Sequence, residues 1–263
     1  MNLLTKTSKI LMGSVLAMTM LATPVFADTY SPPLKTPEIY GKKYSFTSEV
    51  WVRYANPKTV EAVAFVESLS GDVPVGYMGG QAYLYDKAGN LKAGSTMVYN
   101  DDSFSAFHVY SPRMSTYGEY YAFSRADFYN GNGYTRYAGN KSPIQTLNSS
   151  TFAKTTEDSK VIEDLLSKTE YDVNDNGETY GSGLSILSIG EEPDLISAIG
   201  TNGVKGYVRA IDLTPEVSSI EEAIEANKDN GDISTIPLYD VDGTTVLGEF
   251  ELVTNFELDP EKK

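Results

Sequence analysis

Seven short segments rich in β-branched and aromatic residues follow one another between residues 44 and 137, with turn residues between them. This rhythm is typical of an antiparallel β-sandwich or a barrel, because each short strand is followed by a tight reversal. Two turns are explicit, at 86–90 and 130–133, where Gly and Asn tolerate a positive φ. We therefore predict a mainly β fold with an N-terminal antiparallel β-sandwich over 44–147. The expected strands are 49–54, 60–66, 76–85, 91–99, 104–110, 117–129 and 133–137.

Charge and aromatic content divide the chain into two parts. Residues 28–150 hold 11 Lys+Arg and 11 Asp+Glu, whereas residues 151–263 hold 8 and 25. Of the 19 tyrosines, 15 lie between Tyr30 and Tyr137. Such a split indicates two modules with different surfaces. We place the boundary near 148, in a stretch rich in Ser, Thr and Asn, and expect residues 148–263 to form a small acidic α+β domain.

The acidic half alternates helical and strand patterns. A helix with apolar residues at 161, 162, 165 and 166 is expected after a cap at Thr155 or Thr156. Residues 192–196 predict a second short helix, with a proline near its start. Residues 218–221 read as a capping box for a helix that buries Ile220, Ala223 and Ile224 and stops before Gly231. A strand is expected at 206–211, and a hairpin at 236–250 around Asp-Gly.

The first 27 residues predict a secretory signal peptide. Lys6 and Lys9 precede the apolar stretch 10–21, and small or apolar residues at 25–27 suit cleavage after Ala27. The apolar stretch is short of the roughly 20 residues that a membrane-spanning helix needs. Residues 28–43, with three prolines, are expected to be an extended leader without a fold of its own. We expect a secreted, extracellular protein that is not associated with the membrane after cleavage of the signal peptide.

The mature chain is expected to be strongly acidic and free of disulfides. Removal of Lys6 and Lys9 leaves 21 − 2 = 19 basic against 36 acidic residues, a net charge of −17. Nucleic acid and anionic lipid are poor partners for such a surface, whereas cations and basic surfaces are better ones. With no cysteine, stability must come from hydrophobic packing.

Few residues suggest catalysis. His108 is the only histidine, and no Gly-x-Ser-x-Gly signature occurs, which speaks against a nucleophile–histidine–acid site. Zinc is disfavoured because cysteine is absent and one histidine leaves only carboxylates as further ligands. Strand alternation places His108 on the face of Tyr110, as an ordinary strand histidine. A pair of carboxylates remains able to hydrolyse glycosides. We assign no catalytic residue, no metal and no cofactor.

Residues 172–177 match the opening of a calcium loop, with oxygen-bearing side chains at positions 1, 3 and 5 and then a glycine. The match fails at position 12, where Gly183 stands in place of a bidentate Glu. Two interpretations stay open: a polar turn that uses Asn176-Gly177, or a weak cation site helped by Glu178.

Aromatic residues crowd the stretch 117–137. Alternation places some of them in a core and others on a face, where they either stabilise the sheet through cross-strand pairs or contact a ligand. Trp51, the only tryptophan, is expected to anchor the core of the first strand. The aromatic residues of this stretch are Tyr117, Tyr120, Tyr121, Phe123, Phe128, Tyr129, Tyr134 and Tyr137.

Five segments of the acidic half carry a resemblance to a known module: 174–182 (NDNGETYGS), 192–196 (EPDLI), 206–209 (GYVR), 236–243 (IPLYDVDG) and 246–250 (VLGEF). In their order and spacing they resemble a small module of uncharacterised exported proteins from Gram-positive, spore-forming (Bacillus- and Clostridium-type) bacteria. The resemblance implies export and lineage, and no activity. The N-terminal half is similar, in segments 75–86, 129–134 and 141–143, to exported β proteins of the same bacteria. In strand rhythm and aromatic content it is similar to secreted β-sandwich bacteriocins of the lactococcin type.

Taken together, these features predict a non-enzymatic extracellular or cell-surface binding protein. Its Tyr-rich half is expected to contact cell-wall polymer or another extracellular protein, and its acidic half to give a solubilising surface that attracts cations. Two alternatives from other classes are a carboxylate-dependent polysaccharide hydrolase and a bacteriocin-like antagonist.

Overall fold

The computed structural model describes residues 27–149, 155–156, 159–214, 216–227 and 229–259. Strands make up 48% and helices 11% of the structure, which confirms the prediction of a mainly β fold. Among the described residues, no helix is long and apolar enough to cross a membrane. The predicted signal peptide lies outside the described residues, apart from its last residue, Ala27.

The first sheet joins the two ends of the described chain. The segment 28–43, expected as a leader, forms two short strands that pair with the first long strand. The last described strand pairs with the edge of the same sheet. The strand order is β1 (Ala27–Tyr30), β3 (Tyr44–Arg53), β4 (Thr59–Ser68), β8 (Ala106–Tyr110) and β19 (Phe256–Leu258), with β2 (Leu34–Lys35) also on β3.

The second sheet runs through both halves of the sequence. Its N-terminal strands are β5 (Met78–Asp86), β6 (Leu91–Ser95), β7 (Val98–Tyr99), β9 (Gly118–Tyr129), β10 (Tyr134–Ala138) and β11 (Ile144–Leu147). Its later strands are β12 (Thr155–Thr156), β13 (Asp172–Val173), β14 (Thr179–Gly181), β15 (Leu195–Ile199), β16 (Lys205–Arg209), β17 (Ile233–Tyr239) and β18 (Val246–Val253). Each predicted strand of the Tyr-rich half is present, and the expected 91–99 strand is split into β6 and β7.

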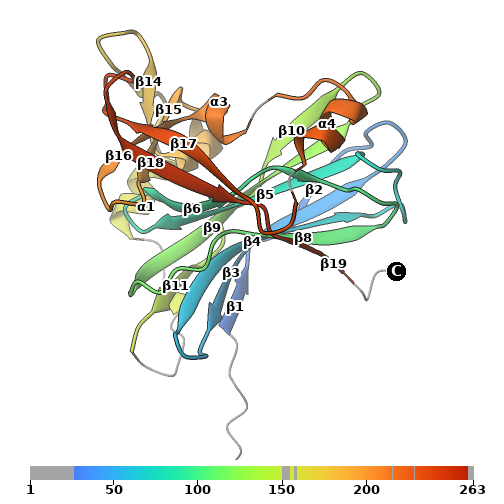
Figure 1. Cartoon of the computed structure of the whole chain (residues 1–263), viewed down its shortest axis with the longest axis horizontal. Helices are drawn as coiled ribbons and strands as arrows, with labels where there is room; N and C mark the ends of the chain where they lie inside the picture. Colours follow the sequence, from blue (N-terminus) through green and yellow to red (C-terminus); the bar gives the residue numbers. More distant parts are fainter. Residues whose placement is uncertain (1–26, 150–154, 157–158, 215, 228, 260–263) are drawn as a thin grey trace, which may run out of the picture.

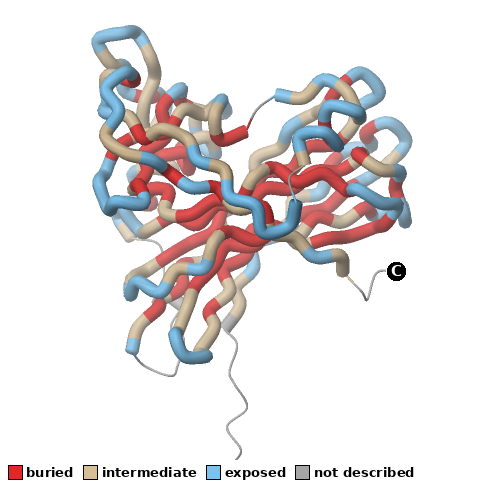
Figure 2. The backbone as a smooth tube through the Cα atoms, in the orientation of Figure 1, coloured by how far each residue is buried: buried red, intermediate tan, exposed pale blue. Residues whose placement is uncertain are grey.

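The two sheets pack against each other around a dry core. Phe46, Val66 and Phe107 of the first sheet meet Met78 and Phe128 of the second, and all five are at most 1% exposed. Full burial of such side chains contributes about 1.5–3 kcal/mol each. The red interior strands and pale-blue loop tips of Figure 2 show the same division. This core fixes the sheet ends from which the loops project.

Four strands of the acidic half form a five-stranded barrel together with β6, which belongs to the N-terminal half of the sequence. That strand pairs in parallel with β15 and with β18, while β17 and β16 complete the ring. The barrel interior holds Leu91, Ile196, Val208, Leu238 and Phe250, none more than 2% exposed. Because β6 is also antiparallel to β5, the barrel continues the second sheet (Figure 1). Hydrogen bonds therefore cross the predicted boundary near 148, which stays a prediction.

A buried polar network also ties the halves together. The Gln81 side chain donates to the carbonyl of Leu213 at 2.9 Å and accepts from the Thr214 hydroxyl at 2.6 Å. Arg125 of β9, only 1% exposed, forms an ion pair with Glu192, in the segment before β15. A buried charge is tolerated only when it is paired. These contacts hold β5 and β9 to the segments that flank the barrel strands.

The helices are short, and three predictions about them are wrong. They are α1 (Lys160–Leu166), η1 (Gly183–Ser185), α2 (Ile186–Ile189), α3 (Ala210–Leu213) and α4 (Ile220–Ala226). The N-cap of α1 is Ser159, whereas 155–156 form β12. Residues 195–196 begin β15 and no helix starts there, because the Asp194 carboxylate accepts hydrogen bonds from Thr179. In α4 only Ala223 is buried, and Ile224 is 39% exposed.

Candidate functional site

The aromatic residues at 117–137 divide between buried and half-buried positions. Strand β9 turns alternate side chains to opposite faces, and its aromatic residues Tyr120, Tyr121, Phe123 and Phe128 are all buried. Tyr120 and Phe128 join the core between the sheets, while Tyr121 and Phe123 join the core of the barrel side. Tyr129 at the end of β9 and Tyr134 and Tyr137 of β10 stay half-buried.

Four tyrosines gather at the β9–β10 end of the second sheet, and we call them the tyrosine cluster: Tyr40, Tyr77, Tyr129 and Tyr134. The ring centroids of Tyr77 and Tyr129 are 5.2 Å apart, and those of Tyr129 and Tyr134 are 5.8 Å apart. Tyr40 completes the group, at 6.2 Å from Tyr77 and 5.5 Å from Tyr129. The cluster thus joins a loop before β3 to strands of the other sheet.

Tyr40 has an unusual backbone and an open side chain. Its φ is +46°, and no other described residue except glycines has a positive φ. This conformation costs a side-chain-bearing residue roughly 1–2 kcal/mol. The turn is closed by paired backbone hydrogen bonds between Ile39 and Lys42, and the Tyr40 side chain is left 59% exposed. Strain of this kind is often found at functional sites.

The neighbouring turn leaves room for the Tyr40 ring. A Cβ built on Gly131 would approach Tyr40 Cε2 to 2.8 Å, so the ring lies directly on a backbone that lacks a side chain. Asn130 and Asn132 flank this glycine and are exposed. The Asn130 amide is used within its own turn, donating to Thr135 Oγ1. The Asn132 side chain makes no hydrogen bond to any described residue, so its amide is available to a ligand.

Two hydroxyl groups of the cluster, those of Tyr77 and Tyr134, have a raised pKa and stay protonated. Burial raises the pKa of Tyr77, and the neighbouring Tyr40 and Tyr129 add to the shift. Burial also raises the pKa of Tyr134, and the negative charge of Asp127 raises it further. The Tyr134 hydroxyl donates to the carbonyl of Gly76 at 2.6 Å. The cluster is therefore a neutral aromatic surface on a chain of high negative charge.

The outer face of the first sheet carries a second aromatic group, formed by Trp51, Phe65, His108 and Tyr110. The His108 ring lies 4.7 Å from Phe65 and 5.8 Å from Trp51. His108 and Tyr110 share a face, as strand alternation predicts. The prediction that Trp51 anchors the core is wrong, because Val50 and Val52 occupy the inward positions of β3. The indole instead donates to Glu49 Oε2 at 2.8 Å, and Arg53 covers its ring.

Two carboxylates on this face, Glu49 and Glu61, are buried. Glu49 is 3% exposed, and burial raises its pKa although hydrogen bonds from Thr47 and Trp51 oppose the shift. Glu61 is 1% exposed and accepts from Arg113 Nε at 2.9 Å. Burial lowers the pKa of His108, against the charges of Asp259 and Glu257. Because Glu49 and Glu61 are covered, this arrangement gives a substrate no access to an acid–base pair.

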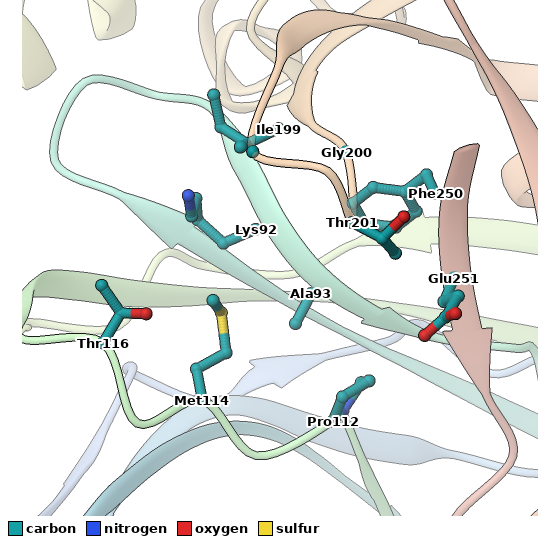
Figure 3. Close-up of a pocket in the computed structure, with 11 residues that line it drawn as sticks. Lys92, Ala93, Pro112, Met114, Thr116, Ile199, Gly200, Thr201, Phe250 and Glu251 are labelled. Atoms are coloured by element: carbon teal, nitrogen blue, oxygen red, sulfur yellow. The ribbon is translucent and has the colours of Figure 1, made fainter. Parts of the chain in front are cut away.

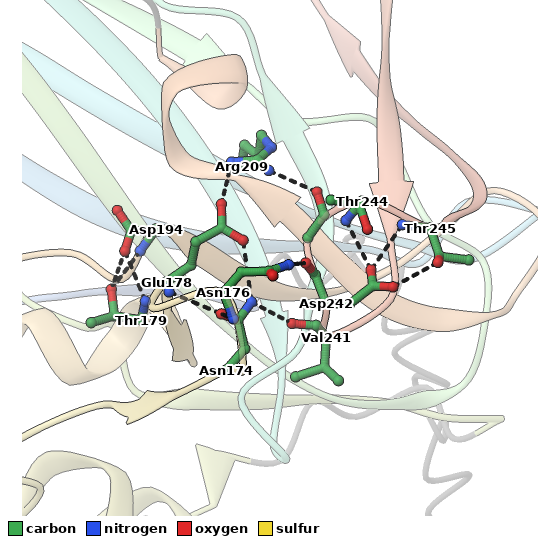
Figure 4. A network of polar contacts seen from close by, with 11 residues as sticks. Asn174, Asn176, Glu178, Thr179, Asp194, Arg209, Val241, Asp242, Thr244 and Thr245 are labelled. Atoms are coloured by element: carbon green, nitrogen blue, oxygen red, sulfur yellow. Dashed lines mark hydrogen bonds and ion pairs between the residues drawn. The ribbon is translucent and has the colours of Figure 1, made fainter.

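The loop at 172–177 is a polar turn in which both ends of the Asn174 side-chain amide are hydrogen-bonded. Asn174 Oδ1 accepts from the amides of Asn176 and Glu178, and Asn174 Nδ2 donates to the carbonyl of Val241 at 2.8 Å. Figure 4 shows how these bonds and the Arg209–Glu178 ion pair, 2.7 Å, join this loop to the 240–245 turn. No group of three or more His, Cys, Asp or Glu suited to a metal occurs in the described part of the chain.

A cavity of about 430 Å³ opens between the 112–116 segment and the barrel. Figure 3 shows Met114 and Thr116 on one side and Ile199, Thr201 and Phe250 on the other. Lys92 and Glu251 are its only charged lining residues. Among the described residues, the lining holds Glu251 as its one carboxylate, so the pair of carboxylates that glycoside hydrolysis uses is not found there.

Comparisons with protein-family models, with curated proteins and with solved structures find no match to this chain. The resemblance to exported bacterial proteins therefore stays a prediction. The tyrosine cluster is the surface whose geometry best fits a functional role.

Proposed function

We propose that this chain is a secreted, non-enzymatic binding protein that contacts a cell-wall polymer through the tyrosine cluster. The observation that carries the proposal is the strained, 59% exposed Tyr40 held against Tyr129. Residues with strained backbone conformations cluster at active sites and ligand-binding sites. Contact between a ligand and the exposed ring of Tyr40 fits that pattern.

The chemistry of the cluster suits a glycan strand. Tyrosine offers a large, rigid ring and a polar tip at low entropic cost, and asparagine adds adaptable hydrogen bonds. The exposed ring of Tyr40 supplies apolar area, Tyr129 supports it edge-on, and Asn132 lies in the adjoining turn. Because the pKa values of Tyr77 and Tyr134 are raised, these two hydroxyls add no negative charge that would repel an anionic polymer.

The same proposal gives each half a part. Residues 44–147 act as the β-sandwich that presents the cluster, and the acidic half around the barrel keeps the protein soluble and attracts cations. The mature protein begins after Ala27 and acts outside the cell. Support for this division comes from the uneven charge of the sequence. Residues 28–150 hold 11 basic and 11 acidic residues, whereas residues 151–263 hold 8 basic and 25 acidic ones.

Co-sedimentation with purified, insoluble peptidoglycan tests the proposal. The mature wild-type protein is expected to pellet with the polymer and to release no soluble sugar fragments over hours. Sedimentation should persist at high salt, since stacking on neutral rings is not screened. Protein that remains in the supernatant would contradict the binding role. Fragment release that is lost on changing a single Asp or Glu would favour the hydrolase instead.

A further inference from the structure

A narrow apolar groove lies where α4 meets the barrel. Its walls come from α3, α4, β17, β18 and the β6–β7 turn, and it encloses about 140 Å³. Small-molecule sites typically enclose about 300–1,000 Å³, so this groove is sized for one or two side chains. Its apolar surface comes mainly from Met97, Tyr99, Leu213, Val217, Ile236 and Leu252.

The wall formed by α4 is fixed at both ends. At its start, the Ser219 hydroxyl accepts from the Glu222 amide, and Glu222 Oε2 accepts from the Ser218 amide at 2.8 Å. At its end, Asn227 Oδ1 accepts from the Tyr99 amide and Asn227 Nδ2 donates to the Tyr99 carbonyl at 2.8 Å. A groove that is already formed loses little entropy when it is occupied.

The segment 210–232, which supplies α3 and α4 to the walls of the groove, is acidic, and we call it the rim. Between residues 210 and 232 the chain has seven acidic residues and one basic residue, Lys228. Asp212 lines the groove itself, and the three glutamates of α4 are exposed. The seven acids are Asp212, Glu216, Glu221, Glu222, Glu225, Asp229 and Asp232. A partner that carries positive charge beside an apolar anchor is complementary to this pattern.

We infer that the groove docks a cationic amphipathic segment of another polypeptide. One or two aliphatic side chains of that segment fill the groove, and its Lys or Arg residues lie over the rim, as in other helix-in-groove complexes. A second copy of this chain would bring the same acidic surface and be repelled, as would an anionic lipid. The site is separate from the tyrosine cluster and does not rest on its function.

Fluorescence anisotropy with the mature chain tests the inference. The probe is a labelled amphipathic peptide of leucine and lysine, and its control is a scrambled peptide of the same composition. Ala226→Arg places a cation at the groove, and Ala55→Arg makes the same change in an exposed loop. We expect wild type and Ala55→Arg to bind the ordered peptide equally, and Ala226→Arg to bind it at least about tenfold more weakly.

A second pair of variants covers the case in which Ala226→Arg fails to fold, which a thermal melt will show. Asp212→Lys at the rim should weaken binding, whereas Asp240→Lys in an exposed turn should weaken it less. The inference is overturned if the two variants of each pair bind the ordered peptide with equal affinity. It is also overturned if wild type binds the ordered and the scrambled peptide equally, because attraction by net charge alone would then explain binding. A wild-type dimer that Ala226→Arg dissociates would assign the groove to a second copy and overturn the inference too.

Discussion

The ring of Tyr40 stands edge-on to the ring of Tyr129, with centroids 5.5 Å apart and planes inclined by 85°. Edge-to-face pairs of this kind contribute about 0.5–1.5 kcal/mol beyond the area that they bury. That gain is similar in size to the cost of the left-handed backbone at Tyr40. The position is therefore close to neutral for folding, and its exposed ring is free to serve binding.

Tyr40→Gly separates backbone strain from the role of the ring. Glycine accepts a φ of +46° without penalty, while the ring contact is lost. The two effects oppose each other, so the free energy of unfolding should change by less than about 1 kcal/mol. Polymer binding should nevertheless fall. A urea titration measures the first quantity, and a loss of several kcal/mol would show that Tyr40 is a structural residue instead.

Gly131→Ala should displace the Tyr40 ring. Its Cβ would lie 2.8 Å from Tyr40 Cε2, whereas a Cβ on Gly133 would find its nearest neighbour at 3.5 Å. Both glycines have positive φ, so Gly133→Ala reproduces the backbone strain without the collision. We expect Gly131→Ala to weaken polymer binding and Gly133→Ala to leave it unchanged. Equal binding by the two variants would mean that the position of the ring is unimportant.

The stability of Glu49→Gln relative to wild type should depend on pH. Burial raises the pKa of Glu49 in the folded state, so its favourable contribution is complete below the unfolded pKa and is lost as pH rises through the folded pKa. Glutamine cannot ionise and can still accept from Trp51. The Tm of the variant minus that of wild type should therefore increase between pH 4.5 and 8, with 4.5 being the ordinary pKa of the carboxyl. A difference that is flat or that decreases with pH would contradict this burial argument.

The loop at 172–177 should respond to mutation and not to calcium. Asn174→Ala removes hydrogen bonds to Val241, Asn176 and Glu178 and should cost about 1–3 kcal/mol. Asp175→Ala, an exposed change in the same loop, should stay within about 0.5 kcal/mol. Thermal melts in millimolar calcium and in chelator should coincide, because the Asn174 oxygen is already used. A calcium-dependent rise in Tm that Asn174→Ala abolishes would establish a cation site.

Local patterns predicted the strands of the Tyr-rich half and the helix with the capping box. They failed where a tertiary contact replaced a local one. Asp194 has the chemistry of a helix cap, yet it accepts hydrogen bonds from Thr179 and is followed by β15. The pairing of β6 with β15 and β18 joins residues more than a hundred positions apart, and no local period encodes it.

The candidate site was predictable in part. The density of tyrosines indicated an aromatic surface, and the Asn-Gly turn indicated where β9 and β10 reverse. Tyr40 was missed because it lies in the segment expected to be a leader, and its contact with Tyr129 arises only when the two sheets pack. The Tyr40-Gly41 pair was the one local sign of a turn there.

The central claim is tested most directly by the affinity of two single variants for purified peptidoglycan. Tyr40→Ala removes the exposed ring of the cluster, and Tyr117→Ala removes a ring of similar exposure, 60% against 59%, that lies outside it. We predict that Tyr117→Ala binds as wild type and that Tyr40→Ala binds about tenfold more weakly. Both variants stay folded, and the Tm of Tyr40→Ala falls slightly, because the ring contact is lost while the left-handed backbone remains. Equal affinity of the two variants would contradict the central claim.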